Sequence, residues 1–153
     1  MATVEDYGSG RILRSIRFAH LSLMAASLPL IGPMIARKLE ERMESLGIYP
    51  ITLDDAKAII EGCRCCAAGH RVCQPLFPGS AVSESVFIDE LAERMAEAGK
   101  AMMVTKDQTV EILSKYPQNP LVLSKVSGRY LEICRSEPDV CIYWKMRRKG
   151  LNV

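Results

Sequence analysis

The chain has 153 residues, of which 48% are hydrophobic and 25% charged, and this suits a single domain that buries a core without needing disulfides. A net charge of +2 and an aromatic content of 6% exclude a strongly basic protein that binds nucleic acid on stacked aromatic side chains. We therefore expect no nucleic-acid partner.

An uncharged stretch covers residues 18–36, with Arg17 before it and Arg37 after it. Its length approaches that of a membrane span, but Pro29 and Pro33 interrupt it. The stretch is consistent with a buried helix, an interfacial helix that contacts a membrane, or an export signal without a clear cleavage site. We predict a cytoplasmic protein that can associate with a membrane, with export as the alternative.

After this stretch, helical signals follow one another and no period-two strand pattern stands out. Residues 35–46 form an amphipathic pattern that a glycine ends, and residues 83–98 carry apolar side chains at helical spacing. Two capping pairs open further helices, Thr52 with Asp55 and Thr105 with Gln108.

The last third of the chain gives two more helix signals. Asn119 and Pro120 are a cap and a first-position proline, and they predict the longest helix, ending near Cys134. Pro138 begins the last predicted helix, which ends at Gly150.

These signals predict an all-α fold of six or seven short helices, with the cysteine pairs in the turns between helices. Residues 1–35 are predicted to be an apolar segment that is buried, interfacial or membrane-associated. Residues 36–153 are predicted to be a single helical, cysteine-rich domain. Two half-repeats, 36–99 and 100–153, are the alternative, because a Tyr-Pro pair precedes a cysteine pair in both halves.

The six cysteines are the most informative residues. Four form two distant pairs of identical spacing and two crowd the first pair: Cys66-x6-Cys73, Cys134-x6-Cys141, Cys63 and Cys65. Thiols that converge from distant segments can share a metal ion or an iron–sulfur cluster. Disulfides, redox-active thiols and inert buried thiols are the alternatives.

For a metal site with four ligand positions the chain offers five candidate ligands, and we treat Cys65 as a bystander. The predicted ligand pool is Cys63, Cys66, Cys73, Cys134 and Cys141. An iron–sulfur cluster is the predicted cofactor; zinc is the alternative, with His70 as a substitute ligand, or no cofactor at all if disulfides form.

The chain contains no nucleophile elbow, phosphate loop, metalloprotease helix or dinucleotide fingerprint, which favours a protein that is not an enzyme. We therefore expect a small metal-binding protein that works in electron transfer or redox sensing with a partner protein. The alternative is a zinc- or disulfide-stabilised adaptor that docks on a larger complex through its basic C-terminal helix, where Lys145, Arg147, Arg148 and Lys149 lie. The oligomeric state is left open.

One resemblance supports shared thiol chemistry. The run Glu41–Ile48, the motif Cys63-Arg-Cys-Cys66-x6-Cys73 and the run Phe87–Leu91 resemble a small bacterial cysteine-rich helical domain of unassigned function. The similarity covers residues of about 40–92 and is echoed near 117–150 by the segment from Cys134 to Trp144. Leu76-Phe77 stands where that family has Trp-Leu, and the resemblance implies no substrate.

Overall fold

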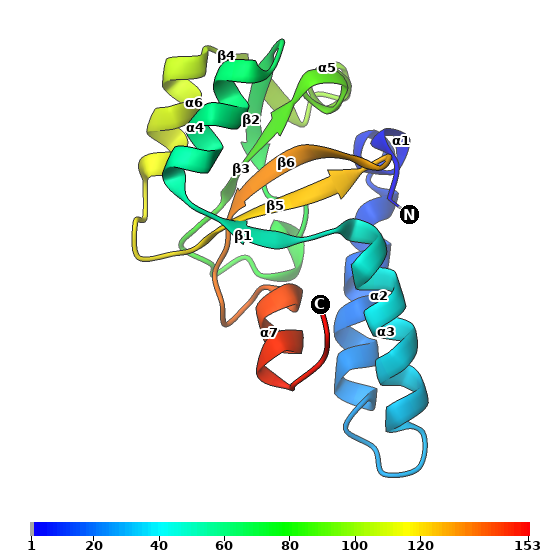
Figure 1. Ribbon diagram of the computed structural model, residues 1–153. Helices are drawn as coiled ribbons and strands as arrows, with labels where there is room; N and C mark the ends of the chain where they lie inside the picture. The colour runs from blue at the N-terminus through cyan, green and yellow to red at the C-terminus, as the bar shows by residue number, and fades with distance from the viewer. Residues whose placement is uncertain (1) are drawn as a thin grey trace.

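A six-stranded antiparallel sheet forms the centre of this protein, and helices cover both of its faces (Figure 1). The computed structural model describes residues 2–153, apart from the side chain of Ser45; Met1, the first residue of the predicted apolar segment, lies outside the described residues. The prediction of an all-α fold is therefore wrong, as is the resemblance to a purely helical domain.

The strands are short, and their order in the sheet is β1-β5-β6-β3-β2-β4. Their bounds are β1 Tyr49–Ile51, β2 Cys66–His70, β3 Glu84–Ile88, β4 Ala101–Val104, β5 Leu121–Val126 and β6 Arg129–Arg135. The helices are α1 Val4–Ser9, α2 Arg11–Ala25, α3 Gly32–Leu46, α4 Leu53–Gly62, α5 Asp89–Glu97, α6 Lys106–Ser114 and α7 Ile142–Arg148, with a 3₁₀ turn, η1, at Gln74–Leu76.

The helix predicted from Asn119 to Cys134 is wrong, because this segment is the β5–β6 hairpin. Ser127 and Gly128 connect the two strands, and both have positive φ values, 53° and 81°. Two successive residues with positive φ match the tight turn whose twist fits an antiparallel hairpin. The turn therefore decides against a helix here, although the apolar residues also fit helical spacing.

The cysteine pairs do not lie in turns between helices. Cys66 is the first residue of β2, and Cys134 lies in β6. The helix predicted over residues 83–98 is also wrong in its first part, because β3 occupies residues 84–88 and α5 begins only at Asp89.

The capping signals are confirmed. Thr52 and Asp55 form a complete capping box at the start of α4, and Thr105 and Gln108 form another at α6. The amphipathic pattern over residues 35–46 lies within α3, which ends at Gly47 with a left-handed backbone (φ 49°). Motifs that act within one turn are thus reliable even where the fold class is not.

The register assigns each central side chain to one of the two faces. Cys66 pairs with Ile88, and Val86, two residues before Ile88, pairs with Ile133, so these four side chains share a face. Because α6 is tied to Arg135, two residues after Ile133, this face is covered by α4 and α6 (Figure 1).

Alternate residues of β6 point to the opposite face. Glu132 on that face is hydrogen-bonded to Tyr7 of α1, and α5 packs there beside α1. Cys134 shares this face with Glu132 and contacts a second apolar cluster, built around Leu23 of α2 and Tyr143 of α7. The sheet therefore separates two apolar layers.

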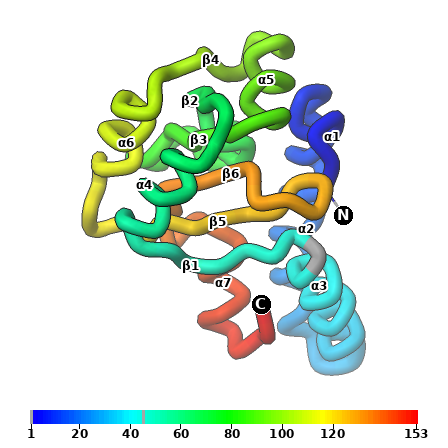
Figure 2. The backbone as a smooth tube through the Cα atoms, turned by 45° about the horizontal axis from the view of Figure 1, so that its top comes forward, coloured from blue at the N-terminus to red at the C-terminus, as the bar shows by residue number. Residues whose placement is uncertain are grey.

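Helices α2 and α3 form a hairpin that projects away from the sheet, with α7 beside it (Figures 1 and 2). The uncharged stretch 18–36 spans the end of α2, the connecting turn and the start of α3. Within the described part of the chain, no helix combines the length and the apolar character that crossing a membrane requires.

The two edges of the sheet are β1 and β4. β1 has three residues and contains Pro50, whereas β4 has four residues and exposes Met102 and Met103.

Candidate functional site

Cys63 and Cys66 meet at the junction between α4 and β2, and their Sγ atoms are 3.2 Å apart. Cys63 is the C-cap residue of α4, and its thiol donates a hydrogen bond of 3.1 Å to the carbonyl of Ile60. The chain then turns into β2, which brings Cys66 back against Cys63. Both belong to the main apolar core, with 7% of Cys63 and 1% of Cys66 exposed.

This environment disfavours the thiolate of Cys63. Burial, together with the hydrogen bond to Cys66 and the proximity of that thiol, raises the pKa of Cys63 to about 12. Lys106 acts in the opposite direction without cancelling the shift. The Cys63 thiol is therefore protonated at neutral pH.

Cys65, predicted to be a bystander, points elsewhere. Its thiol lies 3.6 Å from the carbonyl of Asp89, and burial raises its pKa. The Asp89 carboxylate accepts a hydrogen bond of 2.7 Å from the backbone N–H of Arg64, which holds the turn between Cys63 and Cys66 against α5. The contacts of Arg64 and Cys65 with Asp89 thus leave Cys66 as the thiol that faces Cys63.

The other three thiols form a second group. Cys73 precedes η1, Cys134 lies in β6 and Cys141 precedes α7, and each interacts electrostatically with the other two. Burial raises the pKa of Cys73 to about 11 and raises the pKa of Cys134 and of Cys141 as well.

A buried polar cluster lies beside this second group. Tyr7 donates a hydrogen bond of 2.7 Å to Glu132, and Ser85 donates one of 2.9 Å to its other carboxylate oxygen. Arg71, 2% exposed, extends its Nη2 toward Ser80 and Gln74, while its Nε is buried without a hydrogen-bond partner in the described part of the chain. Burial raises the pKa of Glu132, although Tyr7, Ser85 and Arg71 oppose the shift.

Sequence reasoning missed this polar cluster. Glu132 and Arg71 are ordinary charged residues in a chain read as helical, where a charge is expected on a solvated face. The one available signal is the alternation Leu131, Glu132, Ile133, which places Glu132 on the opposite side from two apolar neighbours once β6 is recognised as a strand.

The five predicted ligands do not converge on one point. Cys63 and Cys66 lie on the face covered by α4 and α6, whereas Cys134 lies on the opposite face with Glu132. His70, the substitute ligand, is exposed at the end of β2. The structure thus divides the predicted ligand set into a pair and a group of three.

Among the described residues, no group of three or more His, Cys, Asp or Glu side chains is placed to hold a metal ion. The description of the chain as an all-α, metal-binding, iron–sulfur protein is therefore wrong for this structure, whereas a role in electron transfer stays a prediction. The sequence reasoning failed because equal spacing of the cysteine pairs says nothing about the face on which each thiol lies.

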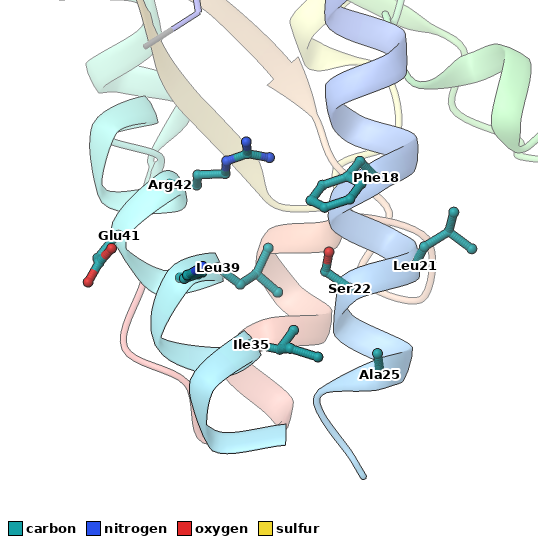
Figure 3. Close-up of a pocket in the computed structure, with 9 residues that line it drawn as sticks. Phe18, Leu21, Ser22, Ala25, Ile35, Leu39, Glu41 and Arg42 are labelled. Atoms are coloured by element: carbon teal, nitrogen blue, oxygen red, sulfur yellow. The ribbon is translucent and has the colours of Figure 1, made fainter. Parts of the chain in front are cut away.

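A second candidate surface lies between α2 and α3, where a groove of about 880 Å³ is open to solvent (Figure 3). Phe18, Leu21 and Ile35 form apolar walls, and the guanidinium of Arg42 lies 5.2 Å from the centre of the Phe18 ring. Glu41 points outward from the groove in Figure 3, so the lining is mainly apolar.

The basic C-terminal end packs on its own domain. Arg148 binds Asp139 at 2.6 Å, and Arg147 donates a hydrogen bond of 3.1 Å to the hydroxyl of Tyr143. Lys145 lies 5.2 Å from the centre of the Phe77 ring. These contacts hold α7 to the loop before it and to Phe77, the residue after η1.

Comparison of the chain with protein-family models, with curated proteins and with solved structures gives no match. A functional argument for this protein therefore starts from its own side chains.

Proposed function

We propose that this protein is a thiol–disulfide redox sensor whose reacting groups are Cys63 and Cys66. The observation that supports it is the 3.2 Å contact between the two Sγ atoms. A disulfide bond is about 2.05 Å long, so the sulfur atoms need to approach by only roughly 1 Å. Dithiols with two intervening residues are a common arrangement in redox proteins.

The oxidant in this proposal is a low-molecular-weight disulfide such as oxidised glutathione. The Cys63 thiolate attacks one sulfur of the oxidant, a mixed disulfide forms, and the first small thiolate leaves and takes up a proton. The Cys66 thiolate then attacks Sγ of Cys63, the intramolecular bond forms, and the second small thiol leaves. Two electrons pass from the protein to the oxidant.

The environment of Cys63 makes this sensor slow. Because its pKa is raised to about 12 by burial and by Cys66, only a minute fraction is thiolate at neutral pH. The same environment does not stabilise the reduced pair as a thiolate, which favours the disulfide once it has formed. The sensor therefore responds to lasting oxidation and not to a brief pulse.

Oxidation alters the end of α4. Cys63 loses the proton that it donates to the Ile60 carbonyl, while a covalent bond ties the α4 end to β2. The signal thus arises at the α4–β2 junction, where a partner protein reads it. We propose the cytoplasm as its location, because reducing compartments keep thiols free and all six cysteines are free in this structure.

The test is a redox titration of the full chain in glutathione buffers, with free thiols alkylated and counted by mass spectrometry. We use Cys65→Ser as the working background. In this variant Cys66 is the one cysteine between Arg64 and Arg71, so a modified cysteine in that segment is assigned without ambiguity. The expected product is a single disulfide between Cys63 and Cys66, and it forms in this background as in the wild type.

Cys63→Ser and Cys66→Ser are the matched controls, and each removes this product. Full alkylation of Cys63 in the wild type under the most oxidising buffer overturns the proposal. So does a disulfide that joins Cys63 or Cys66 to a cysteine of the second group.

A further inference from the structure

The end of the α2–α3 hairpin carries an unusual concentration of exposed apolar side chains. We call this end the apolar tip and define it by Met24, Leu28, Leu30, Ile31 and Met34. Leu30 is 96% exposed and Met24 is 73% exposed. Contiguous apolar surface of this kind marks a binding site in a soluble domain.

The tip carries no charge. Residues 18–36 contain no Asp, Glu, Lys or Arg. The one titratable side chain there is His20, and burial, followed by the nearby charge of Lys145, lowers its pKa to about 4. The stretch is therefore neutral at physiological pH.

Cations surround the base of the tip. Arg37 and Lys38 follow it on α3, and α7 brings Lys145 and Lys149 to the other side; we call these four the cationic collar. The Nζ of Lys149 donates a hydrogen bond of 2.5 Å to the hydroxyl of Ser27, which places α7 against the turn of the hairpin.

A pocket of about 430 Å³ lies between the hairpin and α7, inside this collar. Its lining includes His20, Met24 and Phe77 together with the basic residues Lys145, Arg148 and Lys149. The Nε2 of His20 is buried and, in the described part of the chain, has no hydrogen-bond partner. Because Arg148 is already ion-paired with Asp139, the pocket offers the ammonium groups of Lys145 and Lys149 and an unused polar atom beside an apolar surface.

We propose that the protein docks on an anionic phospholipid bilayer through this end of the molecule. The apolar tip enters the boundary between head groups and acyl chains, as the apolar face of an interfacial helix does. The collar contacts the anionic surface, and a lipid phosphate occupies the pocket beside Lys145 and Lys149.

The shape of the tip favours a bilayer over a protein partner. Its apolar residues lie on α2, on the turn and on α3, the elements that form the end of the hairpin (Figures 1 and 2), and all of them are exposed. A bilayer surrounds the end of the hairpin and buries all of these apolar side chains. A flat protein surface would bury only the side chains on one side of the hairpin. A second copy of the chain, seated in the groove of Figure 3, is the competing occupant.

The experiment is flotation of the full chain with vesicles, at low and at high salt. One set contains phosphatidylcholine alone and the other contains phosphatidylcholine mixed with phosphatidylglycerol. We expect the wild type to float with the anionic vesicles and to lose most of this binding between about 0.05 M and about 0.5 M salt.

Three variants separate the contributions, and circular dichroism checks that each one folds. Leu30→Asp is expected to weaken binding by about tenfold or more. The double variant Lys145→Gln, Lys149→Gln is expected to lose roughly tenfold on anionic vesicles only. Met102→Asp is the control, because Met102 is another exposed apolar side chain, 76% exposed on β4 and away from the tip, and this variant is expected to bind like the wild type.

Wild-type protein that stays unbound to anionic vesicles overturns the proposal. Equal binding to both vesicle types, or unchanged binding of a folded Leu30→Asp variant, does so too. A dimer in light scattering that Leu30→Asp dissociates, in the absence of any flotation, identifies the second copy as the occupant. None of these readouts depends on the oxidation of Cys63 and Cys66.

Discussion

Tyr7 on α1 donates its hydroxyl hydrogen to Glu132 on β6, 125 residues further along the chain, over 2.7 Å. The hydroxyl of Ser85 on β3 donates a hydrogen bond to the other oxygen of the same carboxylate. All three side chains are buried. A single carboxylate thus joins a terminal helix to two central strands.

Replacement of Tyr7 by Phe is expected to lower the free energy of unfolding by about 1–3 kcal/mol, because it leaves one oxygen of a buried carboxylate without its donor. Urea unfolding followed by circular dichroism measures the change. Tyr116→Phe is the control, since Tyr116 is exposed and a surface change costs about 0.5 kcal/mol or less. Equal effects of the two variants contradict the structural role of the hydrogen bond.

Glu132 is expected to make stability depend on pH. Burial raises its folded-state pKa above the ordinary value of 4.5, so the folded chain holds this proton more tightly than the unfolded chain does. The resulting contribution to stability is complete below 4.5 and is lost as the pH rises through the folded-state pKa.

Glu132→Gln replaces the titratable carboxyl group by a neutral amide and so removes the contribution of Glu132 to the pH dependence of stability. The unfolding free energy of the wild type should fall relative to that of the variant as the pH rises from about 4 to about 8. Urea unfolding at each pH gives the difference between the two proteins. A difference that stays constant with pH rules out titration of Glu132 in this range.

Substitution of Arg135 by Lys is expected to destabilise the fold. Its guanidinium donates to the carbonyl of Leu113 through Nε and Nη2, at 2.9 and 2.6 Å, to that of Lys115 at 3.0 Å and to that of Asn119 at 2.5 Å. Lys presents its donors from a single point and cannot reproduce this fork.

We expect Arg135→Lys to lower the unfolding free energy by about 2–4 kcal/mol and to increase amide exchange at the end of α6. The comparison is Arg64→Lys, because Arg64 is exposed and its ion pair with Glu93 is of the weak surface kind. If the two variants have similar unfolding midpoints, Arg135 is not the anchor of α6.

Gly69 permits the close approach of β2 and β4. A methyl group at this position would overlap the carbonyl oxygen of Lys100 and crowd Ala101, and neither can move without breaking the edge pairing. Gly69→Ala should therefore cost about 1–3 kcal/mol of unfolding free energy. Gly62→Ala in α4 meets nothing within 4 Å and should be neutral or stabilising in the same thermal or urea measurement.

Helix caps, which form between residues close in sequence, could be predicted from the sequence. The pairing of strands that are distant in sequence could not. Thr52 with Asp55 and Thr105 with Gln108 are correct because each box is formed within one turn of helix. The segment 121–135 contains apolar residues that suit a helix as well as a strand. Its turn residues, Ser127 and Gly128, decide between the two.

The candidate site could be predicted in its residue types and not in its geometry. The sequence brings out the cysteines and the short spacing from Cys63 to Cys66, which the structure places in contact. The face of each strand residue follows from its partners across the sheet. Without the pairing of Val86 with Ile133, nothing in the sequence places Cys134 opposite to Cys66.

The unlike edges of the sheet limit how copies of this protein can join. Pro50 lacks a backbone N–H to donate, and β1 offers only three residues, so a strand from another molecule gains little there. β4 contains no proline and exposes Met102 and Met103. Association through strand addition would therefore use β4 of both copies and stop at a closed pair, and an open fibre could not grow.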